Sequence, residues 1–511
     1  MKIAFAQQNS AVANPITSEE KVLNSQPAAG HGIGVRVMQN TAALLVGRGA
    51  ALVLAAIASI WLVRCLAPEQ LGKFAAIYAF LGLFTWVASW GVGPLIAREA
   101  ALNREQAGSI VFTGFCISAA FTGAAVALAF AVAPVFHLAG KIYPLLCIAA
   151  VEILLMVPFG LPSIIFQVDL RQWYSSLFNV IRQVFWLGVV IAAYFAGAPL
   201  LYIIAGRLGV AAIETALNWH YGRRLLAPHA VFLSPLAKRL IRGGLVITLT
   251  TVASTIYLRI DQVMLHRMAT DAALGQYAAA VRISEFFEAL PAAFGSSLFP
   301  LLVISIADSP RFRRHLDLGY RYMILASVAL SIFFCTGARP VLHLLYGAKY
   351  AAAAPLLAIL IWAEVAVFFG STLANAMLAA GLQRIVLWPT IAGAVVNIGL
   401  NLYMIPHYGA WGASWATVIA YWTCWTVAFL PFRECREIVW VGLRLLIPFT
   451  VVAIAITGLS YLAPVGDWVR PIIAVAAFGA LACIFGFARK QDLEFIRSAW
   501  KTRLGLKKTE A

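Results

Sequence analysis

Charged side chains are scarce in this sequence. Asp, Glu, Lys and Arg make up 12% of its 511 residues, whereas roughly 25% is usual in soluble domains. Long polar connections are lacking as well, because the segments between its apolar runs, such as residues 222–242, are too short to fold as soluble domains. Hydrophobic residues account for 62% of the chain, and its mean hydropathy is +0.86. These features exclude a soluble protein and predict a polytopic membrane protein.

The sequence also lacks the patterns of metal sites and of common enzymes. Its seven Cys residues form no Cys-x-x-Cys pair and show no spacing suited to a metal. An Asp-x-Asp motif and a His/Cys cluster are missing too, which argues against a catalytic site. We therefore expect no enzyme activity, no catalytic residues, no metal and no cofactor.

A cleaved signal peptide is not expected either. The first 41 residues contain only one short apolar run, Ile3 to Ala6, whereas a signal peptide needs a longer apolar region. We predict that residues 1–41 form a disordered tail.

Fourteen apolar runs of membrane-spanning length fill the rest of the chain. About 20 apolar residues cross the hydrocarbon core as a helix, and the strands of a membrane barrel would instead alternate over segments of about 10 residues. The predicted fold is therefore all-α. The runs cover residues 42–65, 74–97, 109–135, 144–167, 174–197, 199–221, 243–265, 277–303, 320–345, 354–378, 385–405, 411–431, 441–463 and 470–488.

The chain has a net charge of +17, and its Lys and Arg residues are concentrated in every second loop. Alternate loops, counted with both terminal segments, hold 26 of the 38 Lys and Arg residues, and the opposite loops hold seven. This asymmetry is the signature of cytoplasmic loops rather than of a nucleic-acid partner. It places both termini in the cytoplasm.

A short internal repeat divides the chain into two halves. Leu71-Gly72-Lys73-Phe74-Ala75-Ala76 opens the second predicted helix, and Leu274-Gly275-Gln276-Tyr277-Ala278-Ala279 opens the eighth, 203 residues later. Such repeats are found in transporters. The predicted parts are an N-lobe over 42–221, a basic linker over 222–242, a C-lobe over 243–432, two further helices over 433–488 and a basic cytoplasmic tail over 489–511.

Charged residues interrupt the apolar runs. Each costs roughly 3 kcal/mol or more in hydrocarbon unless it is paired or faces water, so such residues usually line a pathway. They are Arg48, Glu152, Arg182, Arg207, Glu214, Arg259, Asp261, Arg282, Glu285, Glu288 and Glu364.

Several local motifs together make the chain resemble the polysaccharide and oligosaccharide flippases, the Wzx-type members of the multidrug/oligosaccharidyl-lipid/polysaccharide exporter superfamily. The first half carries Leu66-x-Pro68-x-x-x-Gly72 and Gly91-x-Gly93. The second half carries Asp261, Leu274-Gly275-x-Tyr277, Phe299-Pro300, Leu345-Tyr346-Gly347-x-x-Tyr350, Leu378-Ala379-Ala380-Gly381, Asn397-x-x-x-Asn401, Ile405-Pro406 and Gly409-x-x-Gly412.

The resemblance implies two six-helix lobes around a central cavity that opens alternately to each side of the bacterial inner membrane. The expected cargo is a polyprenyl-diphosphate-linked oligosaccharide for O-antigen, capsule or exopolysaccharide synthesis. Other partners implied are membrane lipids, H⁺ or Na⁺ as a coupling ion and further polysaccharide assembly proteins.

An anionic diphosphate needs a cationic lining, and Arg suits it because the planar guanidinium bonds phosphate oxygens in pairs. The candidates are Arg48, Arg182, Arg207, Arg259 and Arg282. The alternative is that each Arg reaches an interface or pairs with a carboxylate. Arg282 shares a helix face with Glu285, and Arg207 shares one with Glu214.

Carboxylates and amides supply the remaining candidates. Asp261, Glu285 and Glu364 are candidates for ion coupling or gating, because an intramembrane carboxylate can take up a proton or coordinate sodium. Asn397 and Asn401 lie on one helix face, where they can contact sugar hydroxyls or hydrogen-bond a neighbouring helix.

Three other functions remain open. A lipid II flippase and a cation-coupled multidrug exporter belong to the same superfamily, although five intramembrane Arg residues fit a cationic drug poorly. An integral-membrane glycosyltransferase or polymerase would act on the same lipid-linked sugars, but it commonly needs a sizeable soluble loop.

Overall fold

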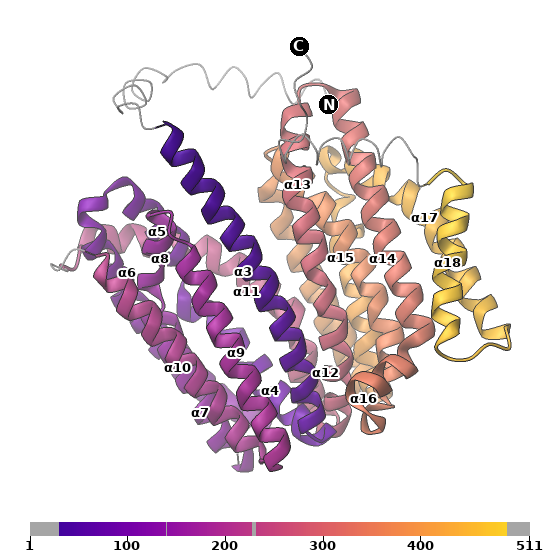
Figure 1. Ribbon diagram of the computed structural model, residues 1–511, viewed down its shortest axis with the longest axis horizontal. Helices are drawn as coiled ribbons and strands as arrows, with labels where there is room; N and C mark the ends of the chain where they lie inside the picture. The colour runs from indigo at the N-terminus through magenta and orange to yellow at the C-terminus, as the bar shows by residue number, and fades with distance from the viewer. Residues whose placement is uncertain (1–29, 139, 227–230, 488–511) are drawn as a thin grey trace.

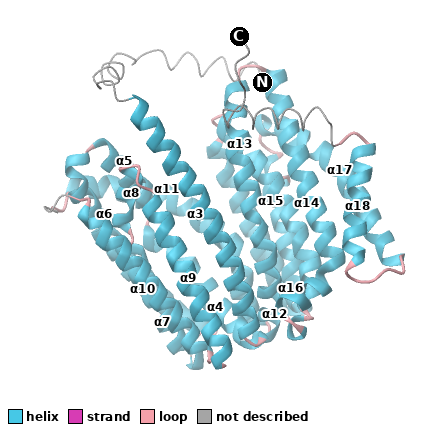
Figure 2. Cartoon of the chain, in the orientation of Figure 1, coloured by secondary structure: helices cyan, strands magenta, loops and turns pink. Residues whose placement is uncertain are grey.

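The computed structural model describes residues 30–487, except 139 and 227–230, and this part of the chain contains helices and no strands (Figures 1 and 2). Long apolar segments form helices in a membrane because every backbone N–H and C=O must be bonded within the segment. The predicted all-α fold is confirmed. Of the tail predicted as disordered over residues 1–41, residues 1–29 lie outside the described residues, whereas residues 30–41 are helical, contrary to the prediction. The predicted basic tail over 489–511 lies wholly outside the described residues.

Two helical bundles stand side by side in Figure 1. The first contains α3 (Gly30–Cys65), α4 (Pro68–Ser89), α5 (Val92–Leu102), α6 (Ala107–Val132), α7 (Tyr143–Phe159), α8 (Ile164–Val168), α9 (Trp173–Ala196) and α10 (Leu200–Arg224). The second contains α12 (Asp271–Glu285), α13 (Ala289–Ser305), α14 (Ser309–Tyr346), α15 (Ala353–Ala379) and α16 (Leu387–Trp425). Between them, α11 (Ser234–Met268) packs on both α4 and α16.

The last two helices lie against the outer side of the second bundle. They are α17 (Arg433–Leu462), which packs on α14 and α15, and α18 (Val469–Ile484), which packs on α14 and α17. Phe449 of α17 and Phe478 of α18 are fully buried in this contact. The side chains of α17 and α18 therefore extend the hydrophobic core of the second bundle outward.

Twelve helices in the described part of the chain are long and apolar enough to cross a membrane. The longest of these, Arg384–Phe429, is broken at Gly409, whose φ of +56° and ψ of −132° are not helical. It accounts for two of the predicted runs, and the shorter apolar helix Val469–Ile484 accounts for a third. The fourteen predicted apolar runs are thus all helical in the structure.

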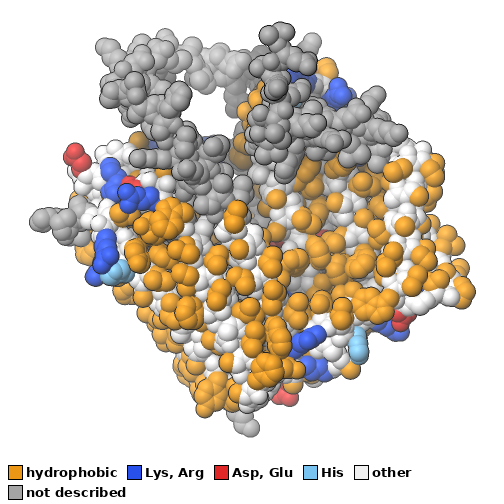
Figure 3. Space-filling model, in the orientation of Figure 1, with side chains coloured by type: hydrophobic (Ala, Val, Ile, Leu, Met, Phe, Trp, Pro, Cys, Tyr) orange, Lys and Arg blue, Asp and Glu red, His pale blue; other side chains and the backbone are white. Residues whose placement is uncertain are grey.

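Exposed hydrophobic side chains surround the bundle. Leu462 is 80% exposed, Phe195 75% and Ile304 71%. Figure 3 shows hydrophobic side chains across most of the visible face and the Lys and Arg side chains near its margins. Such a surface is typical of a protein surrounded by lipid. Together with the twelve spanning helices, it supports the prediction of a multi-pass membrane protein.

The helices α4 and α12, which line the interface between the bundles, begin at equivalent positions of the sequence repeat. α4 begins with Pro68, a favoured first helical residue, and α12 begins at Asp271 after Thr270, whose hydroxyl accepts from the backbone N–H of Ala273. These starts are 203 residues apart, the offset of the sequence repeat. α12 ends at Glu285, six residues before Pro291, which cannot donate to the carbonyl four residues earlier.

The docking of α17 gives a stability prediction. A Cβ on Gly442 would lie 2.4 Å from Cε2 of Phe369 and 2.8 Å from Cε1 of Tyr320, and both rings are buried. We expect Gly442→Ala to destabilise the fold by about 1–3 kcal/mol through overpacking, measured as a lower midpoint of thermal unfolding. On the same helix Gly458 has open space around it, so Gly458→Ala should stabilise or be neutral. Equal behaviour of the two variants would contradict the packing.

Candidate functional site

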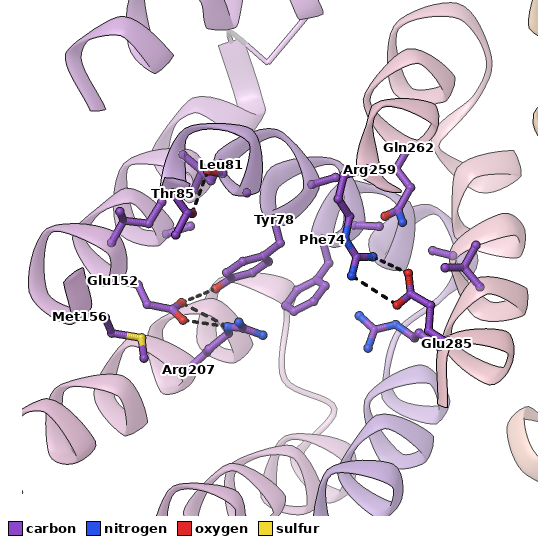
Figure 4. Close-up of a pocket in the computed structure, with 18 of the residues that line it drawn as sticks. Phe74, Tyr78, Leu81, Thr85, Glu152, Met156, Arg207, Arg259, Gln262 and Glu285 are labelled. Atoms are coloured by element: carbon purple, nitrogen blue, oxygen red, sulfur yellow. Dashed lines mark hydrogen bonds and ion pairs between the residues drawn. The ribbon is translucent and has the colours of Figure 1, made fainter. Parts of the chain in front are cut away.

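A cavity of about 560 Å³ lies between the two bundles. Its walls come from α4, α7 and α10 of the first bundle and from α11 and α12 on the other side (Figure 4). Polar and charged side chains line it beside apolar ones. They are Tyr78, Thr85, Glu152, Arg207, Arg259, Gln262, Arg282 and Glu285.

On the side of the first bundle, Arg207 forms an ion pair with Glu152. Arg207 Nε lies 3.2 and 3.1 Å from the two carboxylate oxygens of Glu152, and the hydroxyl of Tyr78 donates to the same carboxylate at 3.1 Å. The guanidinium also lies 4.1 Å from the ring centroid of Tyr78, in cation–π geometry. The three side chains hold one another at the cavity wall, as Figure 4 shows.

On the opposite wall, Arg259 pairs with Glu285. Its two terminal nitrogens donate to the two carboxylate oxygens at 2.8 and 3.3 Å, the bidentate arrangement that Arg forms with carboxylates and phosphates. The pair links α11 to the end of α12, so it also fixes the position of the helix that carries Arg282.

Arg282 differs from these two arginines. Among the described residues no carboxylate lies within ion-pair distance of its guanidinium. Its contacts are a long hydrogen bond to the hydroxyl of Ser59 (3.4 Å) and the ring of Phe74, 5.7 Å away. Arg207 lies 6.0 Å from the same ring. A guanidinium from each bundle therefore approaches Phe74, and that of Arg282 has no carboxylate partner in the described part of the chain.

A second cavity of about 180 Å³ adjoins the first. The two share Glu152, Met156, Arg207 and Arg282 in their linings. We call the pair of cavities the chamber. Trp186 adds an aromatic surface to the second cavity, so both charged and apolar parts of a ligand could be contacted.

Arg182 also lines the second cavity. Its Nε lies 3.1 Å from Glu214, and its terminal nitrogen donates to the side chain of Asn179 at 2.8 Å. The positive charge of Arg182 is therefore compensated in the absence of a ligand.

The structure separates the five predicted arginines. Arg182, Arg207, Arg259 and Arg282 line the chamber, whereas Arg48 is exposed on α3 and lines neither cavity. The neighbouring Gly47 lies so close to Ser176 of α9 that an added Cβ would be 2.7 Å away. α3 therefore turns its small side to α9, and Arg48 extends away from that contact.

The pairings suggested by helix-face spacing are wrong. Arg282 does not pair with Glu285, and Arg207 does not pair with Glu214, because in each case the carboxylate is taken by an arginine of a neighbouring helix. Helix packing brings these partners closer than residues three or seven apart on one helix.

Two of the predicted carboxylates lie outside the chamber. Asp261 is 4% exposed and accepts from the hydroxyl of Tyr277 and from the backbone N–H of Gln262, the latter at 2.7 Å. Glu364 is 2% exposed and accepts from the hydroxyl of Ser284 at 2.7 Å. Glu285 alone of the three predicted acids lines the larger cavity.

Asn397 and Asn401 are completely buried in α16 and do not line the chamber. The amide of Asn401 donates to the side-chain oxygen of Asn397 at 2.9 Å. This geometry agrees with the helix-packing alternative rather than with contact to a sugar.

Two aromatic residues of the site were missed from the sequence. Phe74 lies within the repeated segment, and Tyr78 follows it one helical turn later, so both occupy the same face of α4. The repeat itself was the signal that could have identified them. No group of His, Cys, Asp and Glu that could hold a metal occurs among the described residues.

Similar folds occur in known membrane transporters. The lipid II flippase MurJ in an inward closed conformation superposes with a TM-score of 0.66 at 15% identity, covering 87% of this chain and 98% of that one. An inward-facing multidrug resistance MATE family transporter of the MOP superfamily gives 0.60 at 16% identity, covering 78% and 94%. A MOP superfamily transporter from Pyrococcus furiosus gives 0.53 at 14% identity, covering 80% and 95%. At these identities the likeness is one of fold.

No curated protein matches the sequence significantly. The family of polysaccharide biosynthesis proteins, in contrast, matches residues 37–305. Together with the shared fold, this match confirms the resemblance that the motifs indicated. Since the match covers more than half of the sequence, the chain belongs to the polysaccharide biosynthesis protein family.

Proposed function

We propose that this protein is a flippase that moves a polyprenyl-diphosphate-linked oligosaccharide across the bacterial inner membrane by alternating access. The observation that carries the proposal is Arg282, a guanidinium without a carboxylate partner among the described residues, inside a chamber between two bundles. A partly buried cation without a counter-charge is costly in apolar surroundings, and an anionic ligand would compensate its charge.

The diphosphate fits this position by its chemistry. Arg282 comes from α12 and Arg207 from α10, and both guanidinium groups lie within about 6 Å of the Phe74 ring. A diphosphate bonded to both would connect the two bundles through charge-assisted hydrogen bonds. Both bundles would then contact the cargo directly, and these are the parts that move relative to each other in transport.

The carboxylate-paired arginines would act differently. Arg207, Arg259 and Arg182 each have a compensating carboxylate within 3.1 Å. A phosphate oxygen can replace a carboxylate on a guanidinium because the geometry is the same. Arg282 would therefore bind first, and the paired arginines would follow as the headgroup moves through the chamber.

The orientation in the membrane follows from the charge of the loops, with both termini on the cytoplasmic side. Ion coupling at Asp261, Glu285 or Glu364, contact of Asn397 or Asn401 with sugar, and association with other assembly proteins stay predictions. The lipid II flippase alternative shares the diphosphate chemistry and differs in the attached group.

Deletion in the native host tests the proposal. We expect lipid-linked oligosaccharide to accumulate on the cytoplasmic face and surface polysaccharide to fall at least tenfold, because assembly continues while transport stops. The measurement is extraction and mass spectrometry of the polyprenyl-linked intermediates.

Other outcomes of the deletion would point elsewhere. Accumulation of the peptidoglycan precursor instead would favour the lipid II alternative. Loss of the assembled oligosaccharide itself would favour a glycosyltransferase, and unchanged intermediates together with drug sensitivity would favour an exporter. Re-expression of the chain should reverse the accumulation.

A further inference from the structure

The two copies of the sequence repeat meet at one end of the molecule, where α3 ends and α4 begins. We call this end the base. A Cβ on Gly72 would lie 1.9 Å from the carbonyl oxygen of Asp271, and a Cβ on Gly275 would lie 1.8 Å from the carbonyl oxygen of Pro68. Neither position can hold a larger side chain without moving a helix backbone. The starts of α4 and α12 are therefore in direct contact across the bundle boundary.

The two contacts are equivalent under the sequence repeat. Gly72 and Gly275 are 203 residues apart, and so are Pro68 and Asp271. Exchanging the two halves of the chain thus converts the first contact into the second, as in the interface of a two-fold symmetric dimer. In Figure 1 the bundles converge at this end and diverge toward the end where α3 begins.

A pair of arginines repeats the same symmetry. Arg64 and Arg267 are also 203 residues apart. Arg64, at the end of α3, donates to the carbonyls of Leu345 at 2.7 Å and Leu344 at 2.5 Å, in the last turn of α14. Arg267, at the end of α11, donates to the carbonyl of Val135 at 3.1 Å, just beyond α6. Each cation bonds main-chain oxygens at or beyond a helix end, where a positive charge is favourable.

The end of α3 is bonded in return by the second bundle. Lys349 Nζ donates to the carbonyls of Arg64 at 2.6 Å and of Leu66 at 2.8 Å, and the hydroxyl of Tyr350 donates to Leu66 at 3.0 Å. All of these acceptors are backbone carbonyls at helix ends, which water can bond when the groups separate. The contacts can therefore open without breaking an ion pair.

We propose that these contacts form a pseudo-two-fold latch and that its release opens the chamber at the base. Gly72 and Gly275 provide the close contact between the two helices. The side chains of Arg64, Arg267 and Lys349 form hydrogen bonds to the opposite lobe. The latch holds the base closed in the present structure. Because side chains of one lobe donate to main-chain carbonyls of the other, the latch depends on the approach of the bundles and not on the cargo.

The test measures access to the chamber from each side of the membrane. The full-length chain without its seven Cys residues carries Thr85→Cys, a near-isosteric reporter in the larger cavity. A membrane-impermeant maleimide is applied to right-side-out and to inside-out vesicles. We expect the unaltered latch to allow labelling only from the side away from the base. Gly72→Ala or Gly275→Ala should raise labelling from the base side at least tenfold.

Gly93→Ala is the matched control, since an added Cβ there meets nothing within 4 Å, and it should label like its parent. If an alanine variant fails to fold, the pair Arg64→Gln with Arg267→Gln decides, with an expected rise of at least threefold from the base side. Base-side labelling that stays at the parental rate in every folded latch variant overturns the proposal. The assay needs no cargo, so its outcome is independent of the proposed flippase function.

Discussion

Arg282→Ala is expected to reduce transport at least tenfold without lowering the amount of protein in the membrane. The substitution removes the chamber guanidinium that has no carboxylate partner among the described residues. Each hydrogen bond to a charged group contributes roughly 1.5–3 kcal/mol, so the loss of a bidentate phosphate contact accounts for a change of this size or larger. Stability should not fall, because the substitution removes a partly buried charge that has no carboxylate partner among the described residues.

The measurement is surface polysaccharide in a deletion host that carries the variant, normalised to protein level by immunoblot. Arg282→Lys keeps the charge but loses the planar fork and should give an intermediate value. Arg48→Ala is the control: Arg48 is an intramembrane arginine by sequence, but it is exposed and lines neither cavity. Equal export by Arg48→Ala and Arg282→Ala would contradict the assignment of Arg282 to the cargo.

Binding can be measured apart from transport. Native mass spectrometry with undecaprenyl diphosphate should show weaker retention by Arg282→Ala than by the unaltered protein, and unchanged retention by Arg48→Ala. Normal retention by Arg282→Ala would place its effect in a later step and would contradict first contact at this residue.

Glu152→Ala is expected to destabilise the protein and to abolish transport. It leaves Arg207 without its ion-pair partner and the hydroxyl of Tyr78 without its acceptor. Breaking a fully buried pair costs about 3–5 kcal/mol. Because the Arg207 side chain is 36% exposed to the chamber, we expect a smaller loss of about 2 kcal/mol, in line with partial screening. A lower midpoint of thermal unfolding in detergent would show it.

The double variant Glu152→Met with Arg207→Met separates stability from function. Removing both charges leaves no unpaired ion, and apolar replacements of a buried pair are often neutral or stabilising. The double variant should therefore unfold near the temperature of the unaltered protein, yet it should remain inactive because the N-lobe guanidinium is gone. A double variant as unstable as Glu152→Ala would show that the pair has a structural role that methionine cannot fill.

The comparison of these arginines shows where sequence reasoning reached its limit. Their presence in apolar runs identified them as chamber candidates, and Arg207, Arg259 and Arg282 do line one cavity. Their ion pairs were not predictable, since Arg207 bonds a carboxylate 55 residues away and Arg259 one 26 residues away. A periodicity of 3.6 residues relates positions on one helix and contains no information about which face meets a neighbouring helix.

The asparagines of α16 show the same limit, because their shared helix face was predicted but its neighbour was not. Asn397 and Asn401 were correctly placed on one helix face, and their side chains bond each other. Whether that face meets a cavity or another helix depends on how α16 folds back at Gly409. The sequence left both alternatives open, and the packing selects burial.

The sequence by itself determined the membrane environment, the all-α fold, the helical segments and the 203-residue repeat, because hydrophobic length and local periodicity are properties of contiguous residues. Only the tertiary structure decided which arginine remains without a carboxylate, which carboxylates are removed from the chamber and how the repeated glycines meet at the base. These outcomes depend on the rotation and close approach of helices far apart in the chain, which are set by the packing of whole bundles.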